Sequence, residues 1–129
     1  MNDAKTTIDN LKLKIKQFMD EREWRQFHSP KNVSMSIVRE ASELMEHFLW
    51  CDNNESFDEV EKKRIAVEDE IADVAVGLLN FCTIANIDLN QAIERKLEKN
   101  RVKYPIDKSK GRSEKYLHYQ EIKNKNRSS

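Results

Sequence analysis

Two pairs of carboxylates are spaced so that they could together bind a cation. Glu40 and Glu43 lie three residues apart, and so do Glu70 and Asp73. In a helix, this spacing puts both members of a pair on one side, one turn apart. If the two helices pack antiparallel, all four carboxylates meet at the border of an apolar face. Four anions held together need a counter-ion, and a divalent cation with oxygen ligands supplies one.

The alternative for each pair is a solvated acidic helix face, which Glu-rich helices often carry by chance. Two pairs that both border apolar faces favour convergence. None of His28, His47 and His118 has an acidic residue three positions before it, so the Glu-x-x-His pattern of di-iron bundles is missing. Oxygen ligands alone favour Mg²⁺, with Mn²⁺ as a substitute.

A second group of side chains could hold phosphates. Lys96, Asn100 and Tyr104 recur at every fourth residue of a basic segment, so they share one side of a helix. A cation, an amide and a phenol on one stripe suit a triphosphate and its sugar. The alternative is an ordinary basic last turn that complements the helix dipole.

Two tryptophans stand beside breaks in the helical pattern. Trp24 and Trp50 could sandwich a base, because stacking tolerates any base, or they could plug the ends of a bundle. His28 could donate to a base or a phosphate, or it could tether its loop.

The elements that must position these residues are four helices. Apolar residues recur at helical spacing over residues 6–21, 30–50, 58–85 and 88–104. Ser29 and Pro30 fit the start of the second helix, and Pro105 stops the fourth. The run 71–81 is apolar nearly all round, so we expect it to be the buried centre.

Composition favours an all-α fold with a thin core. The 129 residues include only two Gly and two Pro, whereas 38% are hydrophobic and 36% are charged. We expect one helical domain over residues 1–106, built as a four-helix bundle that oligomerisation completes. Residues 107–129 are expected to form a basic, extended and irregular C-terminal tail.

Charge and cysteine usage exclude several classes of protein. The formal net charge is zero, and the excess of Lys and Arg lies in the tail, so we expect no nucleic-acid partner. No apolar run approaches the length of a membrane span, and no leader segment is apparent. Cys51 and Cys82 form no metal-binding pair. We therefore expect a cytoplasmic protein without a membrane partner.

The motifs together resemble those of the MazG-like, all-α nucleotide pyrophosphohydrolases, most closely the dCTP pyrophosphatase branch. The resemblance covers roughly residues 8–117. Its motifs are Glu23-Trp24-Arg25-Gln26-Phe27-His28-x-Pro30-x-Asn32, Glu40-x-x-Glu43, Phe48-x-Trp50, Glu70-x-x-Asp73, Lys96-x-x-x-Asn100-x-x-x-Tyr104-Pro105 and Lys115-Tyr116.

The resemblance implies a role for each matching position. The carboxylates Glu40, Glu43, Glu70 and Asp73 would form the catalytic magnesium site. The base and sugar would bind to Trp24, Gln26, Phe27, His28 and Trp50, and the phosphates to Lys96, Asn100 and Tyr104. The resemblance also implies a homo-oligomer, either a dimer or a tetramer made from two dimers. Ile15 and Gly77 depart from the dCTP branch, which has His and Tyr there.

We therefore predict a Mg²⁺-dependent nucleoside triphosphate pyrophosphohydrolase that cleanses the nucleotide pool. It would convert a (d)NTP and water to a (d)NMP and pyrophosphate, favouring a deoxynucleotide such as dCTP. In this mechanism Glu43 orients or deprotonates the attacking water. The alternative is a helical nucleotide-binding or regulatory interaction module without catalysis.

Overall fold

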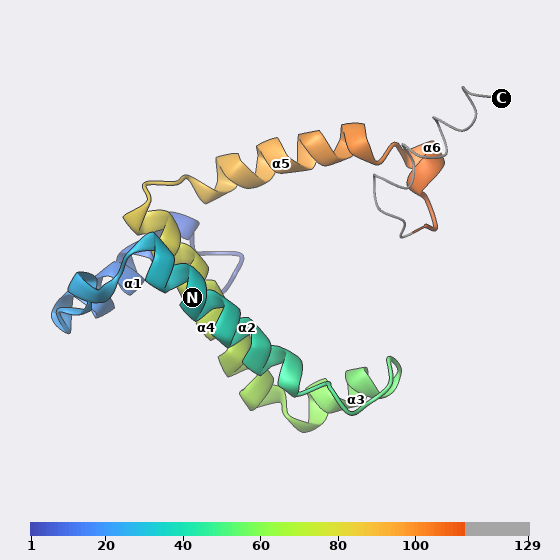
Figure 1. The fold of residues 1–129 in the computed structure, drawn as a ribbon, viewed down its shortest axis with the longest axis horizontal. Coiled ribbons are helices and arrows are strands. Elements are labelled where there is room, and N and C mark those ends of the chain that lie inside the picture. The colour runs from blue at the N-terminus through green and yellow to red at the C-terminus, as the bar shows by residue number, and fades with distance from the viewer. Residues whose placement is uncertain (113–129) are drawn as a thin grey trace. The chain divides into compact units, whose positions relative to one another are not determined.

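The computed structural model describes residues 1–112, which form helices and contain no strand (Figure 1). The predicted all-α class is therefore confirmed. The chain divides into two compact units, Met1–Leu89 and Asn90–Ser129. In chain order the elements are α1 (Ile8–Glu21), the 3₁₀ helix η1 (Trp24–Phe27), α2 (Pro30–Glu46), α3 (Glu55–Lys62), α4 (Arg64–Ile84), α5 (Leu89–Lys103) and α6 (Ile106–Ser109).

The helices α1 and α2 begin where the sequence supplies a side-chain cap. The Thr7 hydroxyl accepts a hydrogen bond from the backbone N–H of Asn10 at 3.1 Å. Ser29 does the same for Asn32 at 3.1 Å, and Pro30 occupies the first turn of α2, as predicted. Proline costs nothing there, because the N–H that it lacks would have no partner within the helix.

Helices α2 and α4 form the most extensive helix pair of the first unit and run antiparallel (Figure 1). Gly77 of α4 lies against Ile37 of α2, where an added Cβ would stand only 2.9 Å from Ile37 Cγ1. The missing side chain therefore permits the close approach of the two helices. Helix α1 also packs on α4. Helix α4 is thus the central element, and it carries one of the two carboxylate pairs.

The prediction of one continuous helix over residues 58–85 is wrong. Two separate helices, α3 and α4, meet there at Lys63 (φ −119°, ψ 32°). The junction contains no Gly or Pro, so local propensity gives no sign of a break. Charged side chains pair within the junction instead. Lys63 Nζ lies 3.1 Å from Glu59 Oε2, and Arg64 pairs with Glu61.

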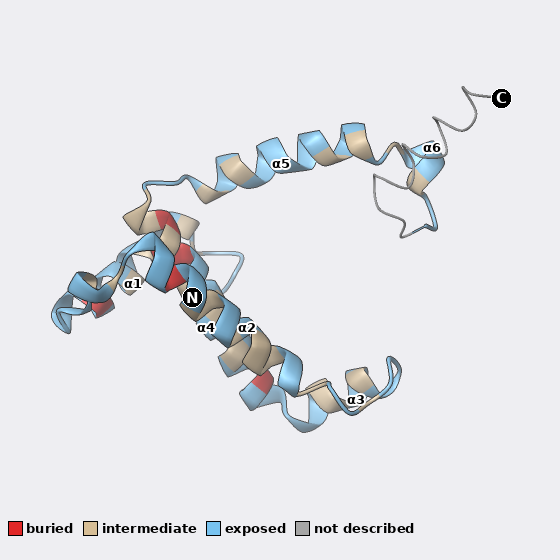
Figure 2. Ribbon diagram, in the orientation of Figure 1, coloured by how far each residue is buried: buried red, intermediate tan, exposed pale blue. Residues whose placement is uncertain are grey.

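The first unit has a thin core, visible as the few short red segments in Figure 2. The predicted burial of segment 71–81 on nearly all sides is wrong for the single chain, since Ile71 and Leu78 are 51% and 46% exposed. Helices α1 and α2 cover only part of the circumference of α4. The buried apolar side chains among the described residues are Met19, Val33, Val67, Leu79 and Cys82.

The second unit contains nearly all of the predicted fourth helix, now α5, which ends two residues before Pro105. The short α6 occupies Ile106–Ser109, and residues 113–129 of the predicted tail lie outside the described residues. The extended form of the tail and the domain boundary at residue 107 remain predictions. In residues 1–112 no single helix has the length and apolarity to cross a membrane, although α4 and α5 taken together meet the criteria of length and composition.

Candidate metal centre and adjoining cavity

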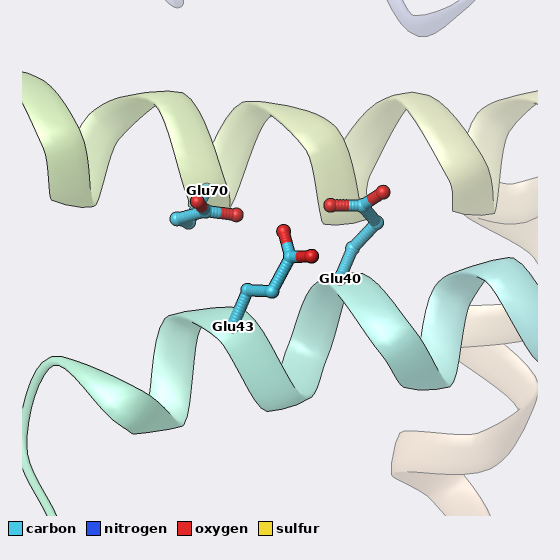
Figure 3. A group of neighbouring side chains, drawn as sticks. All are labelled: Glu40, Glu43 and Glu70. Atoms are coloured by element: carbon cyan, nitrogen blue, oxygen red, sulfur yellow. The ribbon is translucent and has the colours of Figure 1, made fainter.

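Three of the four predicted carboxylates converge at the border between α2 and α4. Glu40 and Glu43 occupy successive turns of α2 and point toward α4 (Figure 3). Glu70 of α4 completes the group, and one oxygen from each carboxylate lies within 4.8 Å of the others. Like charges at this separation repel each other unless a cation lies among them. The cluster could therefore bind a divalent metal ion.

The charge of this cluster is only partly balanced within residues 1–112. Arg39 Nη2 lies 3.2 Å from Glu40 Oε1, but the Arg39 side chain is 69% exposed, so water weakens the pair. Neither Glu43 nor Glu70 forms an ion pair in the described part of the chain. Glu70 Oε2 is buried and has no hydrogen-bond partner among residues 1–112. A bound cation would relieve this cost, and a set of carboxylate oxygens suits a hard ion.

The fourth predicted ligand, Asp73, lies one turn after Glu70 on α4 but is not part of the close group. It lines an adjoining cavity of about 540 Å³ together with Glu40. The carboxylate cluster and the cavity therefore share Glu40, and Asp73 also lines the cavity. A molecule in the cavity would meet the edge of the cluster.

One part of the cavity lining is aromatic. Trp24, Phe27 and His28, all from η1 and the residue after it, line the cavity, as does Phe18 of α1. The rings of Phe18 and Trp24 meet edge to face, with centroids 5.7 Å apart. Contact with Phe18 holds the indole, although Trp24 remains 43% exposed. This wall offers the faces that a flat base needs for stacking.

A hydrogen-bonded network supports the histidine of this wall. Arg25 Nε lies 3.1 Å from Asp20 Oδ1, and Arg25 Nη1 donates to Asn80 Oδ1 at 3.2 Å. Asn80 Nδ2 lies 3.3 Å from His28 Nδ1. Burial, and then the charge of Arg25, lower the pKa of His28 from its ordinary value. The network therefore favours a neutral imidazole at the cavity.

Sequence reasoning did not single out Asn80, Arg39 or Phe18 as site residues. Asn80 had one available signal, because it is an amide within the apolar run Leu78-Leu79-Asn80-Phe81-Cys82. A buried amide requires partners, so its position in that run marks a polar contact. Arg39 and Phe18 gave no comparable signal, because an exposed arginine and an apolar-face phenylalanine are ordinary residues of an amphipathic helix.

Two predicted members of the base pocket lie away from the cavity in the first unit. Gln26 does not line it, and Gln26 Nε2 donates to the backbone oxygen of Glu23 at 2.9 Å. Helix α2 ends at Glu46, earlier than predicted, and turns lead to Trp50. Trp50 is 94% exposed and does not line the cavity. A substrate role for either residue remains a prediction.

The predicted phosphate-binding residues belong to the second unit. Lys96 and Asn100 are one turn apart on α5, and Tyr104 follows the end of that helix. The backbone N–H of Tyr104 donates to the oxygen of Asn100 at 2.8 Å, so the helical path continues to Tyr104. The shared side predicted for Lys96 and Asn100 agrees with this helix. Contact with phosphates remains a prediction.

Comparison with known proteins gives a family match over most of the chain. The model of the MazG-like family matches residues 35–118. The chain is 34% identical over 112 residues to the dCTP pyrophosphatase 1 of Mus musculus, covering 85% of this chain and 66% of that protein. It is 31% identical over 115 residues to the dCTP pyrophosphatase 1 of Bos taurus, covering 88% and 68%. The chain thus spans about two thirds of these relatives.

A solved structure gives an independent match. A pyrophosphatase from Archaeoglobus fulgidus superposes with a TM-score of 0.75 and is 39% identical. The match covers 81% of this chain and 98% of the archaeal chain. The similarity therefore includes nearly the whole of that protein.

Proposed function

The chain belongs to the MazG-like family, and we propose that it is a nucleoside triphosphate pyrophosphohydrolase. The reaction would be (d)NTP and water to (d)NMP and pyrophosphate. We propose dCTP as the favoured substrate, because the relatives from mouse and cattle are named dCTP pyrophosphatase 1. Its role would be to cleanse the nucleotide pool.

One observation carries this proposal. Glu40, Glu43 and Glu70 converge beside an aromatic-walled cavity, and Glu70 Oε2 is buried there without a partner. Hydrolysis of a triphosphate needs cationic stabilisation beside a pocket for the base. The cluster and the cavity supply places for both, and they share Glu40.

The proposed cofactor is Mg²⁺, with Mn²⁺ as a substitute, held by Glu40, Glu43 and Glu70 with Asp73 beside them. When bound there, such an ion would supply Lewis acidity to a water and would neutralise charge on the triphosphate. The carboxylate of Glu43 orients or deprotonates the attacking water. Attack at the α-phosphorus then releases pyrophosphate.

The remaining residues would bind the rest of the nucleotide. Trp24 and Phe27 offer aromatic faces to the base, and His28 offers a polar contact. In the family-based assignment, Gln26 and Trp50 complete that pocket. Lys96, Asn100 and Tyr104 would bind phosphates, either from the same chain or from a neighbouring subunit.

The direct test is a screen of the purified protein against the eight ordinary triphosphates and common damaged ones. Pyrophosphate is measured with Mg²⁺, with Mn²⁺ and with a chelator. We expect release of equal amounts of monophosphate and pyrophosphate, with dCTP among the best substrates and no release with the chelator. Nucleotide binding without turnover would favour the non-catalytic module instead, and release of single phosphates would contradict the proposed bond cleavage.

We also propose that the chain forms a homo-oligomer, either a dimer or a tetramer built from two dimers. Large apolar side chains remain exposed on the packed helices of the first unit, among them Val38 (69%), Ile65 (71%) and Ile71 (51%). Burying such side chains against a second copy would stabilise the thin core. Light scattering after size-exclusion chromatography should give the mass of a dimer or a tetramer, and a monomer at micromolar concentration would contradict this.

The proposed location is the cytoplasm. Both Cys51 and Cys82 are free in the structure. Free thiols agree with a reducing compartment, where disulfides rarely persist. Fractionation of cells that express the native chain would test this location.

A further inference from the structure

Asn80 is a polar side chain in an apolar part of α4. It is only 2% exposed, and its neighbours Leu79 and Cys82 belong to the buried apolar core. An amide in this position must find partners inside the protein. Its two partners are Arg25 and His28, which lie more than fifty positions earlier in the chain.

The chemistry of Arg25 determines which way the Asn80 amide faces. A guanidinium group has only donors, so the Asn80 atom at 3.2 Å from Arg25 Nη1 must be the oxygen. The NH₂ group of Asn80 then faces His28 Nδ1, at 3.3 Å. Asp20 holds the other side of Arg25 through Nε at 3.1 Å. A flipped Asn80 amide would place its NH₂ group against the N–H group of Arg25, which is also a donor. Its oxygen would then face His28 Nδ1 and could accept a hydrogen bond only if Nδ1 carried a proton.

The orientation of Asn80 determines in turn which nitrogen of His28 carries the proton. Because Nδ1 accepts a hydrogen bond from the NH₂ group, a neutral His28 must be protonated on Nε2. Burial and the nearby Arg25 charge lower the pKa of His28, which favours the neutral form. His28 lines the cavity, and its Nδ1 is already engaged. Within residues 1–112 no hydrogen bond engages Nε2, so the Nε2–H group is the donor that remains for a bound molecule.

We propose that Asn80 is a positioning residue that holds His28 in its Nε2–H form, so that His28 donates a hydrogen bond to an acceptor oxygen of the substrate. The identity of that substrate as a nucleotide rests on the proposed function, whereas the proton position does not. The fixed Nε2–H donor makes the pocket selective, because it binds an acceptor on the substrate and repels a donor at the same place.

The proton position is tested by NMR on ¹⁵N-histidine-labelled protein without nucleotide, at a pH where His28 is neutral. The signals of His28 are identified by their loss in His28→Gln. We expect Nε2–H in the native protein. In Asn80→Asp the carboxylate can only accept, so the proton should move to Nδ1. A native protein with Nδ1–H, or an Asn80→Asp variant that keeps neutral Nε2–H, would overturn the assignment.

Two further variants keep the test decisive if Asn80→Asp does not fold. Arg25→Lys retains a group that only donates, so Nε2–H should persist. Arg25→Met removes the group that orients the amide, so a mixture of the two tautomers should appear. Identical proton positions in these two variants would contradict the network. Thr83→Val is the matched control, because Thr83 lies on the same helix and its hydroxyl donates to the Leu79 backbone oxygen at 3.2 Å, outside the network.

The contact with substrate is tested by steady-state kinetics with dCTP. Asn80→Asp should raise KM about ten-fold, the effect of one lost hydrogen bond, and change kcat by less than about three-fold. Arg25→Met should also raise KM, whereas Arg25→Lys should keep KM close to the native value. An altered tautomer with an unchanged KM would overturn the substrate contact. If the native protein released no pyrophosphate, the proposed function would fail, while the NMR result would still decide the proton position.

Discussion

The carboxylate cluster and the network that supports His28 lie in the same helical unit, but they differ in how well their charges and hydrogen bonds are matched. In the cluster, Glu40, Glu43 and Glu70 bring like charges together, and Glu70 Oε2 lacks a partner in the described part of the chain. In the network, donors meet acceptors from Asp20 through to the imidazole. Among its described atoms, only Arg25 Nη2 is buried without a partner.

This difference separates two kinds of site. A cluster of like charges is incomplete by itself and gains stability from a ligand of opposite charge. A network of matched partners is stable by itself and restricts the orientation of its members. We therefore expect substitutions in the cluster to act on ion binding and turnover, and substitutions in the network to act on substrate selection.

The largest effect is expected for Glu70→Gln. An isosteric amide removes one ligand charge, so pyrophosphate release should fall about 10²-fold or more. Stability without a metal should not fall, because the variant no longer buries an unpaired carboxylate oxygen. Rate assays and urea unfolding measure both. Glu46→Gln is the matched control, an exposed glutamate on α2. Unchanged turnover in Glu70→Gln would remove this residue from the site.

The next effect concerns the spacing between α2 and α4. Gly77→Ala would place a Cβ 2.9 Å from Ile37 Cγ1, an overpacking cost of about 1–3 kcal/mol that helix propensity offsets by about 1 kcal/mol. We expect a net loss of stability in urea unfolding and weaker ion binding, with the His28 tautomer unchanged. Ile37→Ala should cost less in the Gly77→Ala background than in the native protein. Additive costs would contradict the predicted contact.

A smaller effect is expected for Arg39→Gln. The exposed Arg39 partly neutralises Glu40, so its removal should tighten binding of Mn²⁺ without nucleotide by about two- to five-fold. Stability should change by less than about 0.5 kcal/mol, because the ion pair is exposed. Titration followed by Mn²⁺ paramagnetic resonance measures the binding. The control is Lys31→Gln, an exposed cation on the same helix, and equal effects of both substitutions would indicate a general charge effect.

The smallest effect is a dependence of stability on pH through His28. Burial and Arg25 place its folded-state pKa below the ordinary value near 6.5. The folded protein therefore binds fewer protons than the unfolded chain as the pH falls below that value, and stability is lost on acidification. The His28→Gln variant should lack this pH-dependent loss. Below about pH 6.5 the free energy of unfolding of the native protein should therefore fall relative to that of His28→Gln. A difference independent of pH would contradict the lowered pKa.

Much of the candidate site could be predicted because it follows from local rules. The spacing of three residues within each carboxylate pair places both members on one side of a helix, whatever that helix packs against. Convergence of Glu40, Glu43 and Glu70 then needed only the antiparallel packing of two apolar faces. Trp24 was a candidate because it stands beside a break in the helical pattern, whereas Phe27 became a candidate only through the family resemblance.

Other features could not be predicted, because no local signal accompanies them. The break at Lys63 lacks both Gly and Pro, and its ion pairs are ordinary surface contacts. Trp50 resembles Trp24 in its position beside a break, yet the structure brings only Trp24 to the cavity. Long-range packing decides such cases, and a periodicity of hydrophobic residues does not encode it.

The amino-acid sequence by itself determined the helical elements, their caps and the carboxylate pairs, since these depend on contacts within about four residues. The tertiary structure alone decided that Asn80 meets Arg25 and His28, that Gly77 faces Ile37 and that Glu70 retains an unpartnered oxygen. The physical reason is that these contacts join segments tens of residues apart, and their geometry exists only after α1, α2 and α4 have packed.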